Sequence, residues 1–487
     1  MSIKGQTKII LTDVATGEKE EYVDNNTFTN AVSDFVNLPF FNPYSTFKTL
    51  TGDVRLKAHD DNTTDSSFFY NGIALFGDTI DTSQYYASGK TQIGYALKGV
   101  ANSSSYSGMY DSSRSSSNVR AYSFTSGQCN GTIKSICLMN PIGAQITYGI
   151  NGVDDKINAY IDSANKCEIN VPFPNPATAV DGEMSAKRGV WSIDKSRYYE
   201  FYTIKNYENK HSAYCDIFEY NANGMDIING DLKKIETKTL LSSTTNAYNS
   251  WAHGDVAYDE ATNKIYYFMN YNSQDNTNKK DIYAFECTIN NDGGLTTRTI
   301  DLKSLCPNST YTITTMEGIQ YYLTLFPHVY NGKMFITVNK YEDYSTEKTM
   351  YVVNLNNLSD KTQVNNPLRY FTDTDYPFYK IGSSVYFGQT DEESFNAKLT
   401  TCVADINAKT IKPVNLKNGV FDVDLYRAKA IPYVWCTKNN KHVGYVDVDG
   451  KYIYLNMMFL TTINNLETPI TKTSDKTMEI VYTLTSE

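Results

Sequence analysis

The sequence predicts an all-β protein in which a β-propeller-like repeat domain is inserted into a split N- and C-terminal β-sandwich-like domain with one short helix. Three observations support this prediction. The chain has 40 tyrosines among 487 residues, with many Asn, Ser and Thr, and aromatic and β-branched residues fit a pleated, half-buried surface. A strand–turn–strand theme recurs through the middle of the chain. Strand-like segments at the two ends have the pattern of sheet partners.

The helix is expected over residues 29–38. Its apolar side chains Ala31, Phe35 and Leu38 recur at helical spacing, and Pro39 would end it because proline cannot continue the hydrogen-bond ladder. The rest of the chain has the patterns of strands and turns.

The repeated theme is a short apolar strand, a turn at Asn-Lys, Asn-Gly, Gly-Ser or Lys-Ser, and a return strand with alternating aromatics. The copies begin about 50 to 75 residues apart, at or above the spacing of propeller blades, which are four-stranded meanders. A pair of irregular sandwiches stays open as the alternative, because no W-D, kelch or S-x-D-x-G-x-T-W signature is present. Five copies start at Gly189, Gly254, His328, Phe378 and Val434, and Ala144 opens a possible sixth.

The ends of the chain are expected to form one domain. The C-terminal run alternates apolar side chains at Met478, Ile480, Tyr482 and Leu484, as a half-buried strand does, and residues 8–14 are its natural partner. The domain boundaries are therefore residues 1–143 and 456–487 for the split domain, and 144–455 for the insert. A Ser-rich stretch, 102–118, is expected to be a mobile or interface-ordered loop.

Charge and composition exclude several classes of protein. The chain has 44 Lys and Arg against 54 Asp and Glu, a net charge of −10, without the basic cluster that phosphate-backbone binding needs. Neither a signal peptide nor a membrane span is visible, so synthesis in the cytosol and no membrane insertion are expected.

No cofactor or metal site is expected. The cysteines are scattered and never form a C-x-x-C spacing, which favours reduced, buried thiols over disulfides or zinc. The histidines are isolated from one another. The cysteines are at 129, 137, 167, 215, 287, 306, 402 and 436, and the histidines at 59, 211, 253, 328 and 442.

Two segments far apart in the chain carry a family resemblance. Residues 124–138 read F-T-S-G-Q-C-N-G-T-I-K-S-I-C-L, and residues 460–484 read L-T-T-I-N-N-L-E-T-P-I-T-K-T-S-D-K-T-M-E-I-V-Y-T-L. Together they resemble the two halves of a pattern in tail proteins of phages and prophages of Gram-positive gut bacteria, and residues 8–18 fit the start of that family. The resemblance leaves the middle of the chain unmatched.

The resemblance implies a virion tail protein of the baseplate or tail-fibre type, assembled in the host cytoplasm. Such proteins contact other tail proteins, usually form homo-oligomers and meet the host surface. In this setting the insert would present a face for host recognition, with a cell-surface glycan as the expected ligand. The alternatives are a purely structural baseplate, fibre or decoration subunit, and a tail-borne polysaccharide depolymerase.

The candidate ligand-binding residues are Trp251, Tyr248, His253 and Asp255, which follow the polar loop 242–247. Aromatic faces stack on sugar rings, while amides and carboxylates bond hydroxyls. The competing interpretation of Trp251 is packing between blades, because the other two tryptophans also lie near the start of a repeat.

No catalytic residue is predicted. The carboxylates Asp447 and Asp449 lie on one strand face, a spacing compatible with glycosidase chemistry. The sequence Asp449-Gly450 is better explained as a hairpin turn. The acidic cluster 59–65 lacks the spaced ligands of a calcium loop.

Overall fold

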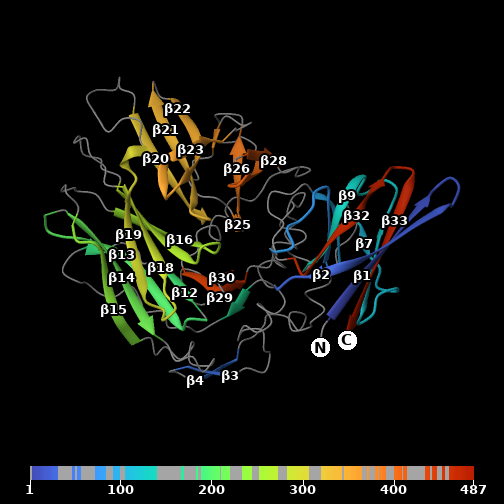
Figure 1. The fold of residues 1–487 in the computed structure, drawn as a ribbon, viewed down its shortest axis with the longest axis horizontal. Helices are drawn as coiled ribbons and strands as arrows, with labels where there is room; N and C mark the ends of the chain where they lie inside the picture. The colour runs from blue at the N-terminus through green and yellow to red at the C-terminus, as the bar shows by residue number, and fades with distance from the viewer. Residues whose placement is uncertain are drawn as a thin grey trace. The chain divides into compact units, whose positions relative to one another are not determined.

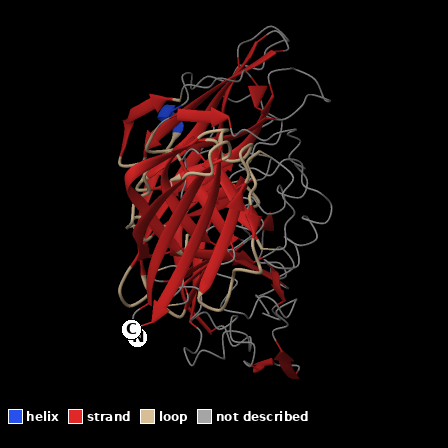
Figure 2. Ribbon diagram, turned by 90° about the vertical axis from the view of Figure 1, so that its right-hand side faces the viewer, coloured by secondary structure: helices blue, strands red, loops and turns tan. Residues whose placement is uncertain are grey.

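The structure is a computed structural model that describes the residues given at the end of this paragraph. These residues form strands and turns with a single 3-10 turn at Lys303–Leu305, so the all-β prediction is confirmed (Figure 2). No helix among these residues is long and apolar enough to cross a membrane. The helix expected at 29–38 lies outside them, except for residues 29 and 30. The described residues are 3–30, 46–49, 52–55, 72–83, 92–98, 105–139, 166–168, 183–184, 188–192, 194–208, 210–219, 233–243, 252–271, 282–305, 320–342, 345–364, 370–371, 379–381, 383–390, 400–408, 410–413, 434–438, 441–446, 452–455 and 460–486.

The chain divides into two compact units. Unit 1 contains Met1–Pro43, Lys57–Asn165 and Asn456–Glu487, and unit 2 contains Tyr44–Leu56 and Lys166–Leu455. Within Tyr44–Leu56, β3 (Thr46–Thr49) and β4 (Gly52–Arg55) form a small hairpin.

Unit 1 is a nine-stranded sheet in the order β6-β5-β9-β32-β2-β1-β33-β8-β7. The two ends of this path approach each other, because Tyr95 of β6 forms a parallel bridge with Ser107, just before β7. The sheet is therefore nearly closed and barrel-like. Its strands are β1 (Ile3–Asp13), β2 (Lys19–Phe28), β5 (Gly72–Phe76), β6 (Gln92–Leu97), β7 (Met109–Tyr110), β8 (Val119–Phe124), β9 (Gly131–Met139), β32 (Thr462–Lys472) and β33 (Lys476–Ser486).

The first and last strands of the chain are direct neighbours, which places the termini side by side (Figure 1). β1 and β33 pair antiparallel along their whole length, with Ile9 opposite Ile480. Met478, Ile480 and Tyr482 are all fully buried. The predicted pairing of the two ends and the predicted buried face of the last strand are both confirmed.

The two segments that carry the family resemblance meet in this sheet. β9 pairs antiparallel with β32, and Ile136 lies opposite Asn464. At one end of the pair, Lys472 donates a 2.8 Å hydrogen bond to Asn130 Oδ1. Near the other end, Ser135 donates a 2.6 Å hydrogen bond to Asn465 Oδ1. Several polar residues of the resemblance thus hold two distant parts of the chain together.

The Ser-rich stretch consists mostly of turns, bends and loop residues over 105–118. It folds onto β8 through hydrogen bonds of its own, and its predicted mobility or ordering at an interface stays a prediction. Asp111 Oδ1 accepts from the Ser113 hydroxyl at 2.6 Å, and Ser115 Oγ accepts from the Ala121 amide at 3.0 Å. Arg114 forms a 3.0 Å ion pair with Glu479 of β33. The serines satisfy local backbone and side-chain groups, which composition alone does not reveal.

Unit 2 contains five antiparallel meanders, here called blades I to V, among its described residues. Blades I, II and III have their four strands in chain order, and blade IV has β24 and β25 both paired with β26. Their strands are, for blade I, β12 (Arg188–Ser192), β13 (Arg197–Lys205), β14 (His211–Glu219) and β15 (Lys233–Leu241); for blade II, β16 (Ala252–Asp259), β17 (Lys264–Tyr271), β18 (Ile282–Ile289) and β19 (Leu295–Asp301); for blade III, β20 (Gln320–Tyr330), β21 (Lys333–Glu342), β22 (Ser345–Asn354) and β23 (Asn357–Gln363); and for blade IV, β24 (Tyr370–Phe371), β25 (Tyr379–Ile381), β26 (Ser384–Thr390), β27 (Thr400–Asp405) and β28 (Thr410–Pro413).

Blade V joins the beginning of unit 2 to its end. It contains β29 (Val434–Lys438), β30 (Lys441–Val446) and β31 (Tyr452–Leu455), and its fourth strand is β10 (Lys166–Glu168) from the start of the unit. Its first strand β29 pairs in parallel with β12, the first strand of blade I. A short strand β11 (Glu183–Met184) adds to β13. The last blade is therefore bonded to the first, as in a propeller-like ring. The sixth copy suggested at Ala144 lies outside the described residues.

The sheet of blade II is buried on both faces, one against blade I and the other against blade III. Along β17, Ile265, Tyr267 and Met269 lie in the core shared with blade I, whereas Tyr266 and Phe268 lie in the core shared with blade III. Neighbouring residues of a strand point to opposite faces, so a strand buried on both sides needs a sheet against each face. This arrangement supports the propeller-like interpretation over a pair of sandwiches.

The turn residues expected from sequence also lie where the blades need them. Ser196, Asn263 and Asn331 have φ of 53°, 53° and 50°, each between the first and second strands of blades I, II and III. Asparagine tolerates this left-handed conformation better than most residues. The predicted Asn-Lys and Asn-Gly turns are confirmed at Asn263-Lys264 and Asn331-Gly332.

Candidate functional site

The candidate site lies at the end of the blades where their first strands begin, here called the loop face. Because strands in a meander alternate in direction, the start of β12, the turn from β13 to β14 and the end of β15 share this end of blade I, and β16 begins at the same end of blade II. At this end, Ser212 near the start of β14 donates a 2.6 Å hydrogen bond to the carbonyl of Ser242, directly after β15.

Two charged side chains on adjacent first strands meet near this face. Arg188 is the first residue of β12, and its Nε lies 3.9 Å from Oδ1 of Asp255 on β16. Each side chain is 20% exposed. The same Asp255 oxygen accepts a 2.8 Å hydrogen bond from the amide of Val256. A guanidinium and a carboxylate in a partly desolvated setting can donate to and accept from ligand hydroxyls.

The structure describes the predicted ligand-binding residues unequally. Asp255 lies on the first strand of blade II beside Arg188. His253 lies on the same strand, opposite Asn270, but its side chain is not described. Trp251 and Tyr248 lie outside the described residues. Of the four predicted residues, Asp255 is thus the one that the structure brings into a defined contact.

Sequence reasoning missed Arg188 and the connection 206–210. Arg188 directly precedes the Gly189 start of the first repeat, so a basic residue at the start of a first strand was the available signal. Its partner could not be identified, because the contact depends on the order of the blades. The tryptophan of blade I, Trp191, is 2% exposed and therefore packs in the core. For this tryptophan, the packing interpretation is confirmed.

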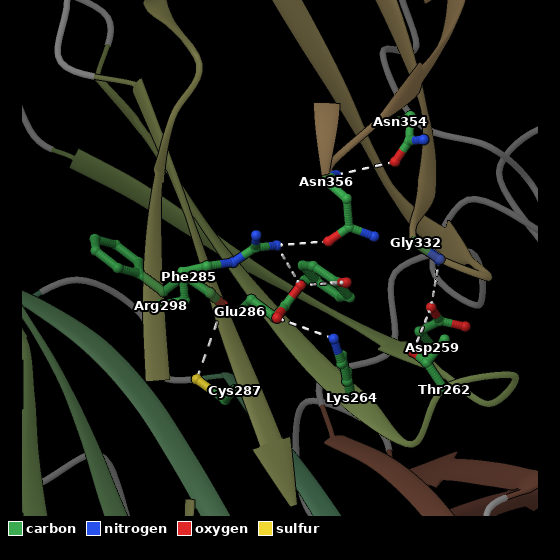
Figure 3. A network of polar contacts seen from close by, with 11 residues as sticks. Asp259, Thr262, Lys264, Phe285, Glu286, Cys287, Arg298, Gly332, Asn354 and Asn356 are labelled. Atoms are coloured by element: carbon green, nitrogen blue, oxygen red, sulfur yellow. Dashed lines mark hydrogen bonds and ion pairs between the residues drawn. The ribbon is translucent and has the colours of Figure 1, made fainter. Parts of the chain in front are cut away.

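A polar network among the described residues of unit 2 joins blades II and III (Figure 3). Glu286 on β18 accepts from Lys264 Nζ at 3.0 Å, from the Tyr266 hydroxyl at 2.9 Å and from Arg298 Nη2 at 2.7 Å. Arg298 also donates a 2.9 Å hydrogen bond to Asn356, in the last turn of blade III. Burial opposes ionisation of Glu286, but its hydrogen bonds with Lys264 and Tyr266 and the charge of Arg298 hold its pKa below the ordinary value.

Blade I contacts blade II in a corresponding way. Arg197 Nη2 lies 3.3 Å from the carbonyl of Asp292, and the hydroxyl of Tyr199 donates a 2.9 Å hydrogen bond to the carbonyl of Gly293. Arg197 contacts the last turn of blade II directly. Lys264 bonds Glu286 of its own blade, and Glu286 also holds Arg298, which reaches Asn356 in the last turn of blade III. The recurrence indicates that these basic and aromatic residues position blades.

The described part of the chain contains no group of three or more His, Cys, Asp or Glu side chains that could hold a metal ion. Cys129, Cys137, Cys215 and Cys287 are free and buried. These four cysteines agree with the prediction of reduced, buried thiols.

Comparison with known proteins gives no family. No family model matches the chain, and no curated protein matches it either. Among solved structures, the polysaccharide lyase Uly1 is 9% identical, with 80% of this chain and 82% of that chain covered at a TM-score of 0.32. The Hadza microbial sialidase Hz136 is 7% identical, with 48% and 45% covered at 0.28. A glycosyl hydrolase from Bacteroides ovatus is 8% identical, with 67% and 99% covered at 0.28. Likenesses at these scores carry no argument about the activity of this chain.

Proposed function

We propose that this chain is a virion tail protein of the baseplate or tail-fibre type, whose unit 2 recognises a glycan on the host surface. The observation that carries the proposal is the pairing of β9 with β32. The two segments that resemble phage tail proteins are neighbouring strands of one sheet, and unit 2 is inserted between them in the sequence. The resemblance is thus concentrated in the unit that would attach to the particle.

The ligand proposal uses the loop face of unit 2. Arg188 and Asp255 supply a partly exposed donor and acceptor there, and Trp251 and Tyr248 belong to the connection that leads into β16. A face that combines charged groups with aromatic rings suits the hydroxyls and apolar ring faces of sugars. Other tail proteins and further copies of this chain are the proposed partners of unit 1.

The first test is binding of the purified full-length chain to intact Gram-positive gut bacteria, with and without removal of their surface polysaccharide. Binding that is lost with the polysaccharide supports the proposal. Absence of binding to every strain, together with tight assembly into a tail particle, would instead favour a structural subunit. Release of reducing sugar from the polysaccharide would favour a depolymerase, the second alternative.

Trp251 provides a residue-level test. If it lies on the binding face, Trp251→Ala leaves the melting temperature nearly unchanged and weakens attachment by about 1–3 kcal/mol. If it packs between blades, the same change lowers the free energy of unfolding by about 3–5 kcal/mol. A large loss of stability would remove Trp251 from the proposed site.

A further inference from the structure

The most exposed large hydrophobic side chain in the described part of the chain is Tyr207, which is 87% exposed. It lies in the connection 206–210 between β13 and β14. Because a tyrosine ring normally buries much of its apolar area, an almost fully exposed ring needs a reason. A single exposed apolar residue is common on protein surfaces, so the argument depends on how this one is held and where it lies.

The connection that carries Tyr207 is held by its own hydrogen bonds. Asn206 Oδ1 accepts from the amides of Glu208 and Lys210, at 3.0 and 2.8 Å. The amide of Asn206 donates to the carbonyl of Lys210 at 2.9 Å. These bonds fix Asn206, Glu208 and Lys210 relative to one another without a ligand, which reduces the ordering cost of binding.

The surroundings of Tyr207 are polar and charged. Glu208 and Lys210 form a 2.9 Å ion pair, and their side chains are 69% and 37% exposed. They offer a carboxylate and an ammonium group within three residues of the ring. An aromatic face flanked by hydrogen-bonding groups matches a pyranose ring, which has an apolar face and a rim of hydroxyls.

Tyr207 also lies at the same end of blade I as the proposed site. β13 ends at Lys205, four residues beyond Phe201, and Phe201 is the residue that pairs with Arg188. The strand therefore extends about 13 Å past the level of Arg188, at roughly 3.3 Å per residue. The connection therefore lies at the loop-face end of blade I, where Ser212 of β14 donates a hydrogen bond to the carbonyl of Ser242, directly after β15.

We infer that Tyr207 is a sugar-stacking residue of the loop face, with Glu208 and Lys210 bonding hydroxyls of the same pyranose and Asn206 acting as the positioning residue. This inference rests on the proposed function and deepens it, because it names a pyranose-containing glycan as the ligand class and adds a second contact region. The ring contributes by its apolar face, so the hydroxyl of Tyr207 is dispensable.

The test measures binding of the full-length chain to a bacterial strain that the unsubstituted chain binds, with soluble polysaccharide of that strain as competitor. Tyr207→Ala is expected to weaken binding about 10-fold or more, the scale of a lost hot-spot contact, whereas Tyr207→Phe keeps it. Asn206→Ala is expected to weaken binding while the ring is still present. Ile235→Ala is the control, because Ile235 is also exposed and lies on β15 of the same blade, near the opposite end.

Three results would overturn the inference. Binding of Tyr207→Ala at the unsubstituted affinity would remove Tyr207 from the site while the proposed function stands. An equal loss in Tyr207→Phe and Tyr207→Ala would show that the hydroxyl, and not the ring face, makes the contact. Failure of the unsubstituted chain to bind any strain would reject the inference together with the proposed function, and this result is distinct from the other two. The melting temperature of each variant separates a binding effect from unfolding.

Discussion

Ser135 donates a 2.6 Å hydrogen bond to Oδ1 of Asn465, which lies 330 positions later in the chain. The same oxygen accepts from the amide of Ile80 at 2.9 Å, and Asn465 Nδ2 donates to the carbonyl of Ile80 at 2.8 Å. Asn465, in β32 near the end of the chain, thus bonds two earlier segments of unit 1, one at Ser135 and one at Ile80. Asn465, which belongs to one of the two segments that carry the family resemblance, therefore has a structural role in unit 1.

Asn465→Ala is expected to lower the free energy of unfolding by about 2–3 kcal/mol, because three hydrogen bonds of about 1 kcal/mol each are lost. Chemical denaturation followed by circular dichroism measures this loss. Thr471→Val is the control: its hydroxyl shares an exposed 3.1 Å contact with Thr132 in the same strand pair, and its loss is expected to cost less than about 0.5 kcal/mol. Equal effects of the two variants would contradict the assigned role of Asn465.

Asp259→Ala is expected to be among the most damaging changes in unit 2. The carboxylate of Asp259 is fully buried and accepts from the amides of Asn331 and Gly332, both at 2.8 Å, in the first turn of blade III. It also accepts from the Thr262 hydroxyl at 2.7 Å. The Gly332 contact is buried and the other two are partly buried. A buried donor left without its acceptor costs about 1–3 kcal/mol and partly buried ones add to it, so a total loss above about 3 kcal/mol is expected in a thermal melt.

The matched control is Asp405→Ala. Asp405 also closes a turn, through the amides of Asn407 and Ala408 at 2.8 and 3.2 Å, but these groups are exposed. Water can replace a carboxylate there, so the expected cost is below about 1 kcal/mol. If both variants lose the same stability, burial is not the reason that Asp259 matters.

The elements predicted from sequence are those that a local pattern encodes. The alternation of Met478, Ile480 and Tyr482 gives the buried face of β33, since the side-chain period of a strand is visible in any short run. The contact between Arg188 and Asp255 was not predictable, because it depends on which blades are neighbours. The exposure of Tyr207 was not predictable either. It depends on the turn that Asn206 holds by accepting from the amides of Glu208 and Lys210, and such a turn has no periodic pattern in the sequence.

Gly293→Ala is expected to loosen the contact between blades I and II. Gly293 has φ of +82°, and a Cβ there would lie 2.7 Å from Cγ of Arg197. Left-handed backbone costs a non-glycine residue about 1–2 kcal/mol, and the clash with Arg197 adds to it. Gly17→Ala separates the two effects, because Gly17 has φ of +75° and a Cβ there meets nothing within 4 Å. Thermal melts should show a larger loss for Gly293→Ala, and equal losses would exclude the clash.

Stability is expected to fall in acid partly through Glu286. Its hydrogen bonds with Lys264 and Tyr266 and the charge of Arg298 outweigh burial and hold its folded pKa below the ordinary value. A carboxyl whose pKa is lowered by folding stabilises the protein above its unfolded pKa, about 4.3 for glutamate, and loses that contribution as pH falls through the folded pKa. In Glu286→Gln this contribution is absent. The difference in unfolding free energy between parent and variant should therefore shrink from pH 7 toward pH 3, and a constant difference would contradict the assignment.

All eight cysteines are expected to be reduced, and the four that the structure shows buried are expected to be unreactive in the folded chain. Burial raises the pKa of the Cys129 thiol to about 12 and also raises the pKa values of Cys137, Cys215 and Cys287. The thiolate is the reactive form, so these four should resist alkylation at pH 8 in the native protein. After unfolding in denaturant without reductant, intact mass measurement should show eight adducts, one for each cysteine in the sequence. A parallel sample treated with reductant and chelator is the control, because more adducts there than in the untreated sample would mean that some cysteines form disulfides or bind metal.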